Sequence, residues 1–170
     1  EQAASRTLLL TSFMSVVVIF LLLYTQFRSA AQSGVILLNL PLALIGGVFA
    51  LVITTGEISI PAIIGFISLF GIATRNGMLL ISHYNHLQKE EGLNVYDSVI
   101  RGSLDRLNPI LMTALSSALA LIPLAFRGDL PGNEIQSPMA KVILGGLLTS
   151  TFLNAFIIPI VYELMNRKKK

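Results

Sequence analysis

A single arginine interrupts the stretch that most constrains this sequence, an apolar run over residues 58–84. As one α-helix the run would be about 40 Å long at ~1.5 Å per residue, which exceeds the ~30 Å hydrocarbon core of a bilayer. Arg75 lies past the middle of the run, roughly 6 Å from the bilayer midplane by the same rise. A guanidinium stays protonated, so at this depth it costs at least a few kcal/mol. The sequence therefore predicts that Arg75 has a buried partner or faces a water-filled path.

The helical face around Arg75 carries further polar residues. At 100° per residue, Ser68 and Ser82 fall close to the direction of Arg75, together with Gly71 and His86. The opposite side of the run consists of Ile, Leu and Phe. A narrow polar stripe that faces a bundle interior is typical of an ion or proton pathway. The alternative is an arginine held by backbone carbonyls, with only a structural role.

The composition places the whole chain in a membrane. It is 54% hydrophobic and 12% charged, with a mean hydropathy of +0.75, far from the mixture found in soluble domains. Cysteine is absent, which excludes disulfides, thiolate metal sites and cysteine nucleophiles. The first residue is Glu and no signal-peptide pattern follows. We therefore expect an integral membrane segment that belongs to a longer chain.

Hydropathy and turn residues predict an all-α membrane protein with five transmembrane helices in one domain, residues 1–170. The expected spans lie near residues 7–27, 34–55, 59–85, 109–126 and 138–164. Between the third and fourth spans, the polar residues around 95–106 predict a short amphipathic helix in the membrane interface. Pro109 is expected to open the fourth span.

Two spans carry small residues along one face, which favours close helix packing. Their members are Asn39, Ala43, Gly46, Gly47 and Ala50 in the second span, and Gly146, Ser150 and Asn154 in the fifth. The fourth span has a similar side made of Thr113, Ser116, Ser117 and Ala120.

Lys and Arg predict the orientation in the membrane. Five spans put the two termini on opposite sides, and the side of the C-terminus holds eight cations: Arg28, Lys89, Arg101, Arg106, Arg167, Lys168, Lys169 and Lys170. The other side holds three, namely Arg6, Arg127 and Lys141. The positive-inside rule therefore predicts a cytoplasmic C-terminus. The basic tail is interpreted as this topology signal, and no nucleic-acid partner is expected.

The sequence lacks the residues that several kinds of chemistry require. The acidic residues all fall in loops or at span ends, so none is expected to reach Arg75 at mid-membrane. There is no nucleotide-binding P-loop pattern, and two histidines without cysteine cannot supply a nucleophile with its base. His83 and His86 have a spacing that could share a metal, but no third ligand lies nearby on their helix, and we interpret them as interfacial histidines. We expect no cofactor, no metal site and no enzyme activity.

Three motifs give this chain a close resemblance to a known family. They are GFISLFGIATRNGMLLISHYNHL, RLNPILMTALSSALALIPL and GNEIQSPMAKVILGGLLTSTFLNAFIIPIVYEL. In order and spacing they resemble spans eight to twelve of the resistance-nodulation-division efflux permeases, inner-membrane antiporters with two six-span halves. The sequence around ATRNG and EIQSPMAKVILGG is most similar to that of the heavy-metal-efflux branch, of the copper/silver or cobalt-zinc-cadmium type.

The resemblance implies a proton relay. In that family, aspartates on the fourth helix exchange protons with a basic residue on the tenth, and Arg75 matches the basic position, where drug exporters carry Lys. Thr113 matches the relay threonine, and Arg106 matches the family's cytoplasmic arginine. Asn76 is a further candidate for support of the relay, with Ser68, Ser82 and Arg106. Where drug exporters often read RLRP, this chain reads RLNP, so Asn108 replaces a cation.

We therefore interpret the chain as the C-terminal transmembrane segment of a proton-driven antiporter in the bacterial inner membrane. Its expected partners are the lipid bilayer, an acidic transmembrane helix elsewhere in its own permease chain, and a homotrimer with a periplasmic adaptor and an outer-membrane channel. The expected substrate is a heavy-metal cation or a drug, and one alternative is a drug or protein-export relative of the same fold. Another is a non-transporting scaffold or receptor-like protein, in which Arg75 forms only a structural ion pair.

Overall fold

The structure, a computed structural model, describes residues 2–127 and 130–167 and consists there of helices joined by short loops. The helices are α1 (Gln2–Phe27), α2 (Ala30–Thr54), α3 (Ile60–Lys89), α4 (Val95–Phe126) and α5 (Gln136–Arg167). All five of these helices are long and apolar enough to cross a membrane. The predicted all-α fold is confirmed for the described residues, with five helices long and apolar enough to cross a membrane.

The connections between helices follow from local turn chemistry. Ser29 caps α2 by accepting a hydrogen bond from the backbone N–H of Gln32, and Ser59 caps α3 in the same way. Pro61 sits in the first turn of α3, where its missing N–H costs nothing. Gly56 and Gly92, in the loops after α2 and α3, have positive φ angles of 67° and 66°, which glycine adopts without strain.

The fourth helix differs from the expectation. Residues 95–106 do not form a separate surface helix, because α4 runs without a break from Val95 to Phe126. Pro109 therefore lies inside a helix instead of opening one, and the predicted break is wrong. A transmembrane helix tolerates an internal proline when neighbouring groups satisfy the freed carbonyl. The other helices also extend past their predicted spans, since polar ends continue a helix beyond the hydrocarbon core.

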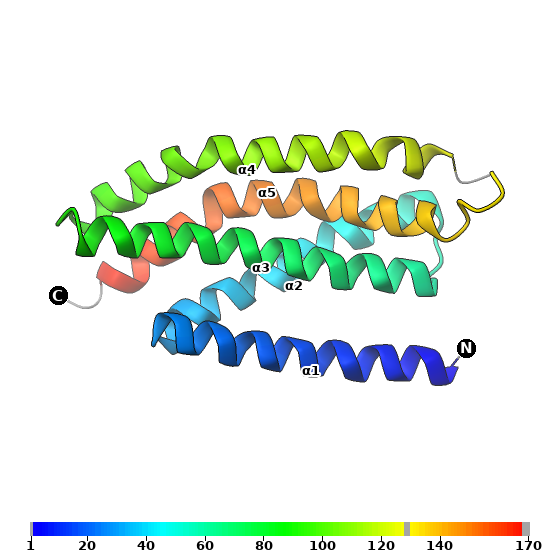
Figure 1. Ribbon diagram of the computed structural model, residues 1–170, viewed down its shortest axis with the longest axis horizontal. Helices are drawn as coiled ribbons and strands as arrows, with labels where there is room; N and C mark the ends of the chain where they lie inside the picture. Colours follow the sequence, from blue (N-terminus) through cyan, green and yellow to red (C-terminus); the bar gives the residue numbers. More distant parts are fainter. Residues whose placement is uncertain (1, 128–129, 168–170) are drawn as a thin grey trace.

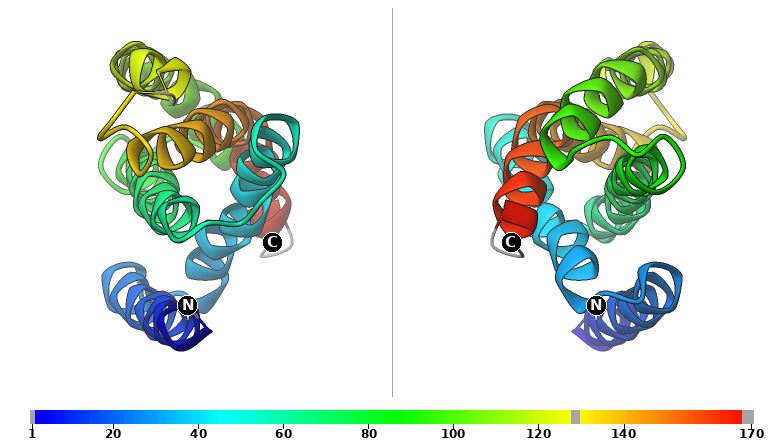
Figure 2. Two further views of the ribbon diagram at one scale, coloured as in Figure 1. Left: turned by 90° about the vertical axis from the view of Figure 1, so that its right-hand side faces the viewer. Right: turned by 90° about the vertical axis from the view of Figure 1, so that its left-hand side faces the viewer.

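Figure 1 shows the helices running side by side along the long axis, with the N- and C-termini at opposite ends. Seen end-on in Figure 2, α5 occupies the middle of the bundle, while α1 lies at its margin. Within residues 2–127 and 130–167, helix α5 contacts α2, α3 and α4, whereas α1 contacts α2 and α3. The C-terminal helix is therefore the centre of this five-helix unit.

The closest approach in the bundle is between α2 and α5, on the small-residue faces that the sequence predicts. Gly46 of α2 and Gly145 of α5 lie so close that a Cβ built on either would meet the backbone of the other at 2.5 Å. Deeper in the same contact, the Asn39 amide donates a hydrogen bond of 2.7 Å to the Asn154 carbonyl oxygen, and both side chains are buried. The close packing expected of the small-residue face of the second span is thus observed at Gly46 and Asn39. In the fifth span, Asn154 takes part in this contact, whereas Gly145 was not on the expected face and Gly146 lies against Leu69 of α3.

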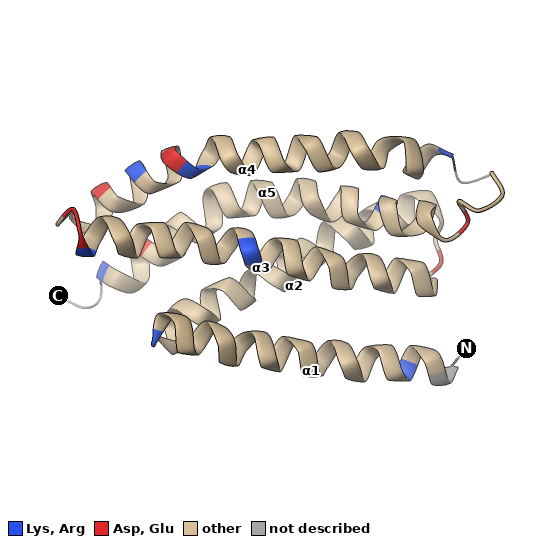
Figure 3. Cartoon of the chain, in the orientation of Figure 1, with Lys and Arg blue, Asp and Glu red and all other residues tan. Residues whose placement is uncertain are grey.

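A second, larger core lies toward the C-terminal end of the bundle. Its members come from all five helices: Leu23, Val35, Ile36, Leu80, Ile81, Tyr84, Val99, Ile158 and Tyr162. This cluster holds α1 and the first half of α4 to the other helices. Figure 3 shows most charged residues near the two ends of the bundle, with one cationic segment midway along α3.

Candidate functional site

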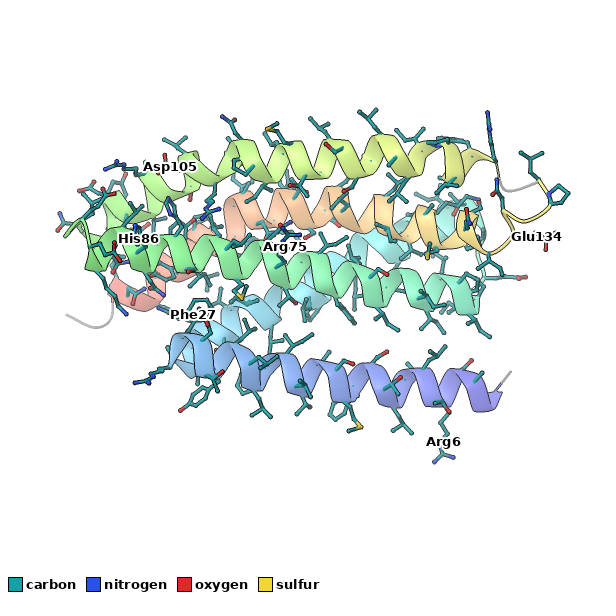
Figure 4. All side chains as sticks on the ribbon, viewed as in Figure 1. Arg6, Phe27, Arg75, His86, Asp105 and Glu134 are labelled. Atoms are coloured by element: carbon teal, nitrogen blue, oxygen red, sulfur yellow. The ribbon has the colours of Figure 1, made fainter. Side chains whose placement is uncertain are left out.

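Arg75 lies at the midpoint of α3. The helix has 30 residues from Ile60 to Lys89, so Arg75 is about 22 Å from either end at ~1.5 Å per residue. Figure 4 labels the side chain about half-way along the bundle. The structure thus places the charge even closer to the centre of its helix than the hydropathy pattern predicts, because α3 continues past residue 84.

Arg75 borders a cavity of about 370 Å³ between α3 and α4. The polar residues lining it are Arg75 and Asn76 from α3, and Arg106, Thr113 and Ser117 from α4. Ile72, Leu79, Leu80, Pro109 and Ile110 complete the wall. The structure therefore brings four of the six candidate relay residues to one cavity, from two helices whose candidate positions are thirty or more residues apart in sequence.

The cavity is electropositive. It contains two guanidinium groups, and Arg75 forms no ion pair or side-chain hydrogen bond within residues 2–127 and 130–167. The residue is exposed in this chain, open to the cavity instead of being enclosed by the five helices. Two like charges in an apolar environment repel each other and favour a nearby anion. The geometry therefore suits a carboxylate that approaches between α3 and α4.

Thr113 faces the same cavity one to two turns above Arg106. Its hydroxyl donates a hydrogen bond of 2.8 Å to the carbonyl oxygen of Pro109, one turn earlier in α4. The oxygen lone pairs remain available to accept a hydrogen bond from a guanidinium or from water. Thr113 and Arg75 share the cavity but are not directly hydrogen-bonded in this structure.

The supporting candidates separate into two groups. Asn76 is 8% exposed and Arg106 is half-buried, and both line the cavity. Ser68 and Ser82 lie on the exposed face of α3 and do not line it; the Ser68 hydroxyl instead donates to the Ile64 carbonyl at 3.0 Å. Ser117, by contrast, lines the cavity although it was no relay candidate, and the signal for it was the hydroxyl-bearing side of the fourth span.

The two histidines near the end of α3 have acidic partners. His83 Nε2 lies 3.2 Å from Asp105 Oδ2 of α4, and His86 Nδ1 lies 3.3 Å from Glu90. Their rings stack with centroids 6.3 Å apart. Sequence reasoning missed the Asp105 contact, because it depends on how α4 packs against α3. No group of three metal-ligating side chains occurs in the described part of the chain.

A hydrogen-bonded network near these histidines was also missed. Gln32 and Asn85 exchange two side-chain hydrogen bonds of 3.1 and 3.0 Å between α2 and α3. The Tyr162 hydroxyl donates to Asn85 Oδ1 at 2.6 Å and accepts from Gln88 at 2.9 Å. Asn and Gln side chains are common at the ends of membrane spans, so the sequence offers no reason to single these out. They form a network because the packing of the helices brings them together. The network joins α2, α3 and α5 just beyond the Arg75 cavity.

Comparison with known proteins identifies the group to which this chain is related. The model of the AcrB/AcrD/AcrF family matches residues 1–166. The nickel-cobalt-cadmium resistance protein NccA of Alcaligenes xylosoxydans xylosoxydans is 40% identical over 169 residues, which cover 99% of this chain and 16% of NccA. The cobalt-zinc-cadmium resistance protein CzcA of Cupriavidus metallidurans is 37% identical over 167 residues, 98% of this chain and 16% of CzcA.

A solved structure agrees with these relatives. The crystal structure of a heavy metal efflux pump, crystal form II, superposes with a TM-score of 0.87 at 36% identity and covers 98% of this chain and 16% of that one. The chain thus spans about a sixth of the length of these relatives. The resemblance inferred from the three sequence motifs, including its heavy-metal-efflux branch, is confirmed.

Proposed function

Because this chain belongs to the AcrB/AcrD/AcrF family of efflux permeases, we propose that it forms the C-terminal spans of a proton-driven efflux transporter. Its relatives include a cation efflux system protein and a heavy metal efflux pump, so we assign its charged residues to energy coupling and not to catalysis. The observation that carries the proposal is Arg75 at mid-helix, which has no ion-pair partner among residues 2–127 and 130–167 and lines a cavity with Thr113 and Arg106.

In this proposal, the cavity between α3 and α4 receives a carboxylate from another helix of the same permease. The resemblance implies that this helix is the fourth, with aspartates facing the basic position. Arg75 stays charged throughout, so the proton binds to the carboxylate. Ionised, the carboxylate pairs with Arg75; protonated, it loses most of that attraction and the two helices separate. Thr113 and Asn76 supply neutral hydrogen-bonding groups along the path.

The electrostatics set the scale of the coupling. An unpaired guanidinium in a membrane costs a few kcal/mol or more, while the net stability of a protein is about 5–15 kcal/mol. Protonation of the partner carboxylate therefore changes the free energy of the helix contact by an amount that is a sizeable part of the net stability of the protein. A shift between two packings of α3 and α4 follows, and it would be transmitted to a periplasmic substrate domain outside these residues.

The other parts of the assignment come from the family and from charge placement. We propose heavy-metal cations as the exported substrate, a homotrimer with periplasmic adaptor and outer-membrane channel as the assembly, and the bacterial inner membrane as the location. The cations gathered at the C-terminal end of the bundle support a cytoplasmic C-terminus by the positive-inside rule.

The test uses the full-length permease in proteoliposomes, with a pH-sensitive dye inside and a metal gradient applied. Arg75→Ala should abolish metal-driven proton flux without lowering the amount of assembled protein. Arg75→Lys should retain part of the flux, since a point charge replaces a planar guanidinium imperfectly. Arg6→Ala, an exposed cation on α1, is the matched control and should be unaffected.

Thr113→Ala provides an independent check of the relay. Losing a hydroxyl that lines the cavity should reduce proton flux severalfold while leaving the thermal stability nearly unchanged, because Thr113 is exposed and bonds only within its own helix. Normal pumping by Arg75→Ala would support the structural alternative, in which the arginine only holds two helices together. A wild-type protein without any proton flux would favour the scaffold.

A further inference from the structure

A furrow of apolar side chains runs along α5, between α2 and α4. Two cavities of about 450 and 350 Å³ lie along it, and Leu148 lines both. A third cavity, of about 470 Å³ between α4 and α5, also borders Leu148 and Phe152. We call this the α5 furrow and define it by Ala50, Phe126, Lys141, Leu144, Leu148 and Phe152. Leu148 and Phe152 are 69% and 65% exposed, which is far more than core residues of a bundle allow. The furrow is therefore open to a further apolar occupant.

One end of the furrow carries the cation Lys141. Lys141 lies in the second turn of α5, is half-buried and lines the cavity with Phe126 and Leu144. It forms no ion pair with a carboxylate of the described residues. A half-buried ammonium beside apolar side chains favours an anionic group that shares the same environment.

The dimensions of the furrow match one leaflet of a bilayer. Eleven residues separate Lys141 from Phe152, which is about 16 Å along α5 at ~1.5 Å per residue. Half of the ~30 Å hydrocarbon core is about 15 Å. If the middle of α5 lies at the midplane, Lys141 lies about 16 Å from it, at the level of the lipid phosphates. Charge and length thus point to the same kind of molecule.

The furrow and the Arg75 cavity lie on different flanks of α4. Arg106, Thr113 and Ser117 face the cavity beside α3, whereas Leu111, Leu115 and Ala118 face the side of α5. The end-on views in Figure 2 show α3 and α2 on opposite sides of α5. A helix that pairs with Arg75 would therefore approach from the α3 side and leave the furrow uncovered.

From this we infer that the α5 furrow binds an anionic phospholipid, with the phosphate on the Lys141 ammonium and one acyl chain along Leu144, Leu148 and Phe152. The Lys141 ammonium selects the anionic headgroup, and the apolar side chains of the furrow bind the acyl chain. The six residues that define the furrow do not line the Arg75 cavity, although the 470 Å³ cavity shares Leu80 and Ile110 with it. Lipid binding requires that the five helices span the membrane and that the furrow faces lipid.

The test measures lipid contact at the furrow in the full-length permease. A bimane probe is attached to Leu148→Cys, in a background whose other cysteines are replaced, and the protein is placed in phosphatidylcholine nanodiscs. Phosphatidylglycerol or phosphatidylcholine with brominated acyl chains is then added as quencher. We expect phosphatidylglycerol to compete about fivefold better than phosphatidylcholine, the preference that one lysine near anionic lipid provides.

Variants of the cation decide the interpretation. Lys141→Gln should remove the preference for phosphatidylglycerol, Lys141→Arg should keep it, and Arg6→Gln on α1 should not change it. Equal quenching by both lipids in the wild type would overturn the proposal, since it would report bulk lipid only. Absence of quenching by either lipid would also overturn it, because another protein segment or a second copy would then cover the furrow. Proton flux is not measured, so the outcome is separate from that of the proposed relay.

Discussion

The contact between α2 and α5 offers the sharpest test of the fold, through the substitution Gly46→Ala. A Cβ at Gly46 would lie 2.5 Å from the carbonyl oxygen of Gly145 and would also overlap the side chain of Thr149. The threonine can change rotamer, but the Gly145 carbonyl belongs to a helix backbone and cannot move alone. The two helices must therefore separate to accept one methyl group.

The size of the effect follows from two opposing contributions. Overpacking of a closely packed contact costs about 1–3 kcal/mol, while Gly→Ala within a helix contributes about 0.5–1 kcal/mol of stabilisation. Gly34 lies in the same helix, and a Cβ there would meet nothing within 4 Å. We therefore expect Gly46→Ala to destabilise the protein by about 0–2.5 kcal/mol net, and Gly34→Ala to leave it unchanged or stabilise it by up to about 1 kcal/mol. The helix gain is common to both, so the two variants should differ by about 1–3 kcal/mol.

The assay is thermal unfolding of the full-length permease in detergent, followed for wild type, Gly46→Ala and Gly34→Ala under identical conditions. The quantity of interest is the difference between the two alanine variants, which removes effects common to any methyl group added to α2. Equal midpoints for the two variants would show that α2 and α5 do not approach at Gly46. A higher midpoint for Gly46→Ala would refute the packing outright.

Two further predictions concern hydrogen bonds and ion pairs. Asn154→Ala should destabilise the protein by about 1–3 kcal/mol because it leaves the buried Asn39 amide without its partner, and a double-mutant cycle with Asn39→Ala should yield a coupling of about 0.6–1.7 kcal/mol, as measured by unfolding. Additive single effects would contradict this pairing. Glu91→Gln removes the exposed ion pair with Arg101 and should change stability by less than about 1 kcal/mol; a larger loss in the same assay would show that the loop between α3 and α4 carries more of the fold.

Much of the fold was predictable because its main determinant is local. A bilayer sets the length of each span, so apolar runs predict five helices without any knowledge of their packing. The depth of Arg75 follows from its place within one such run. The small faces around Gly46 and Asn154 were also predictable, since membrane helices pack closely only where side chains are small.

The tertiary structure decided which residues of neighbouring helices each helical face contacts. Thr113 and Asn76 share a cavity with Arg75, whereas Ser68 and Ser82 do not line it. This difference depends on where α4 crosses α3, and the residue pattern of one helix does not predict that crossing. The continuous α4 is a similar case, because a proline breaks an isolated helix but is tolerated where neighbouring helices hold both halves.

The polar contacts at the C-terminal end depended most on the fold. His83 reaches Asp105 from a different helix, and the Asn85 amide is shared by residues of α2 and α5. Such partners are far apart in sequence and belong to common residue types, so their spacing along the chain does not predict that they form hydrogen bonds with one another. The residue types and their depth in the membrane were properties of the sequence. Their partners required α2, α3, α4 and α5 to pack together, because a hydrogen bond forms only where donor and acceptor lie about 3 Å apart.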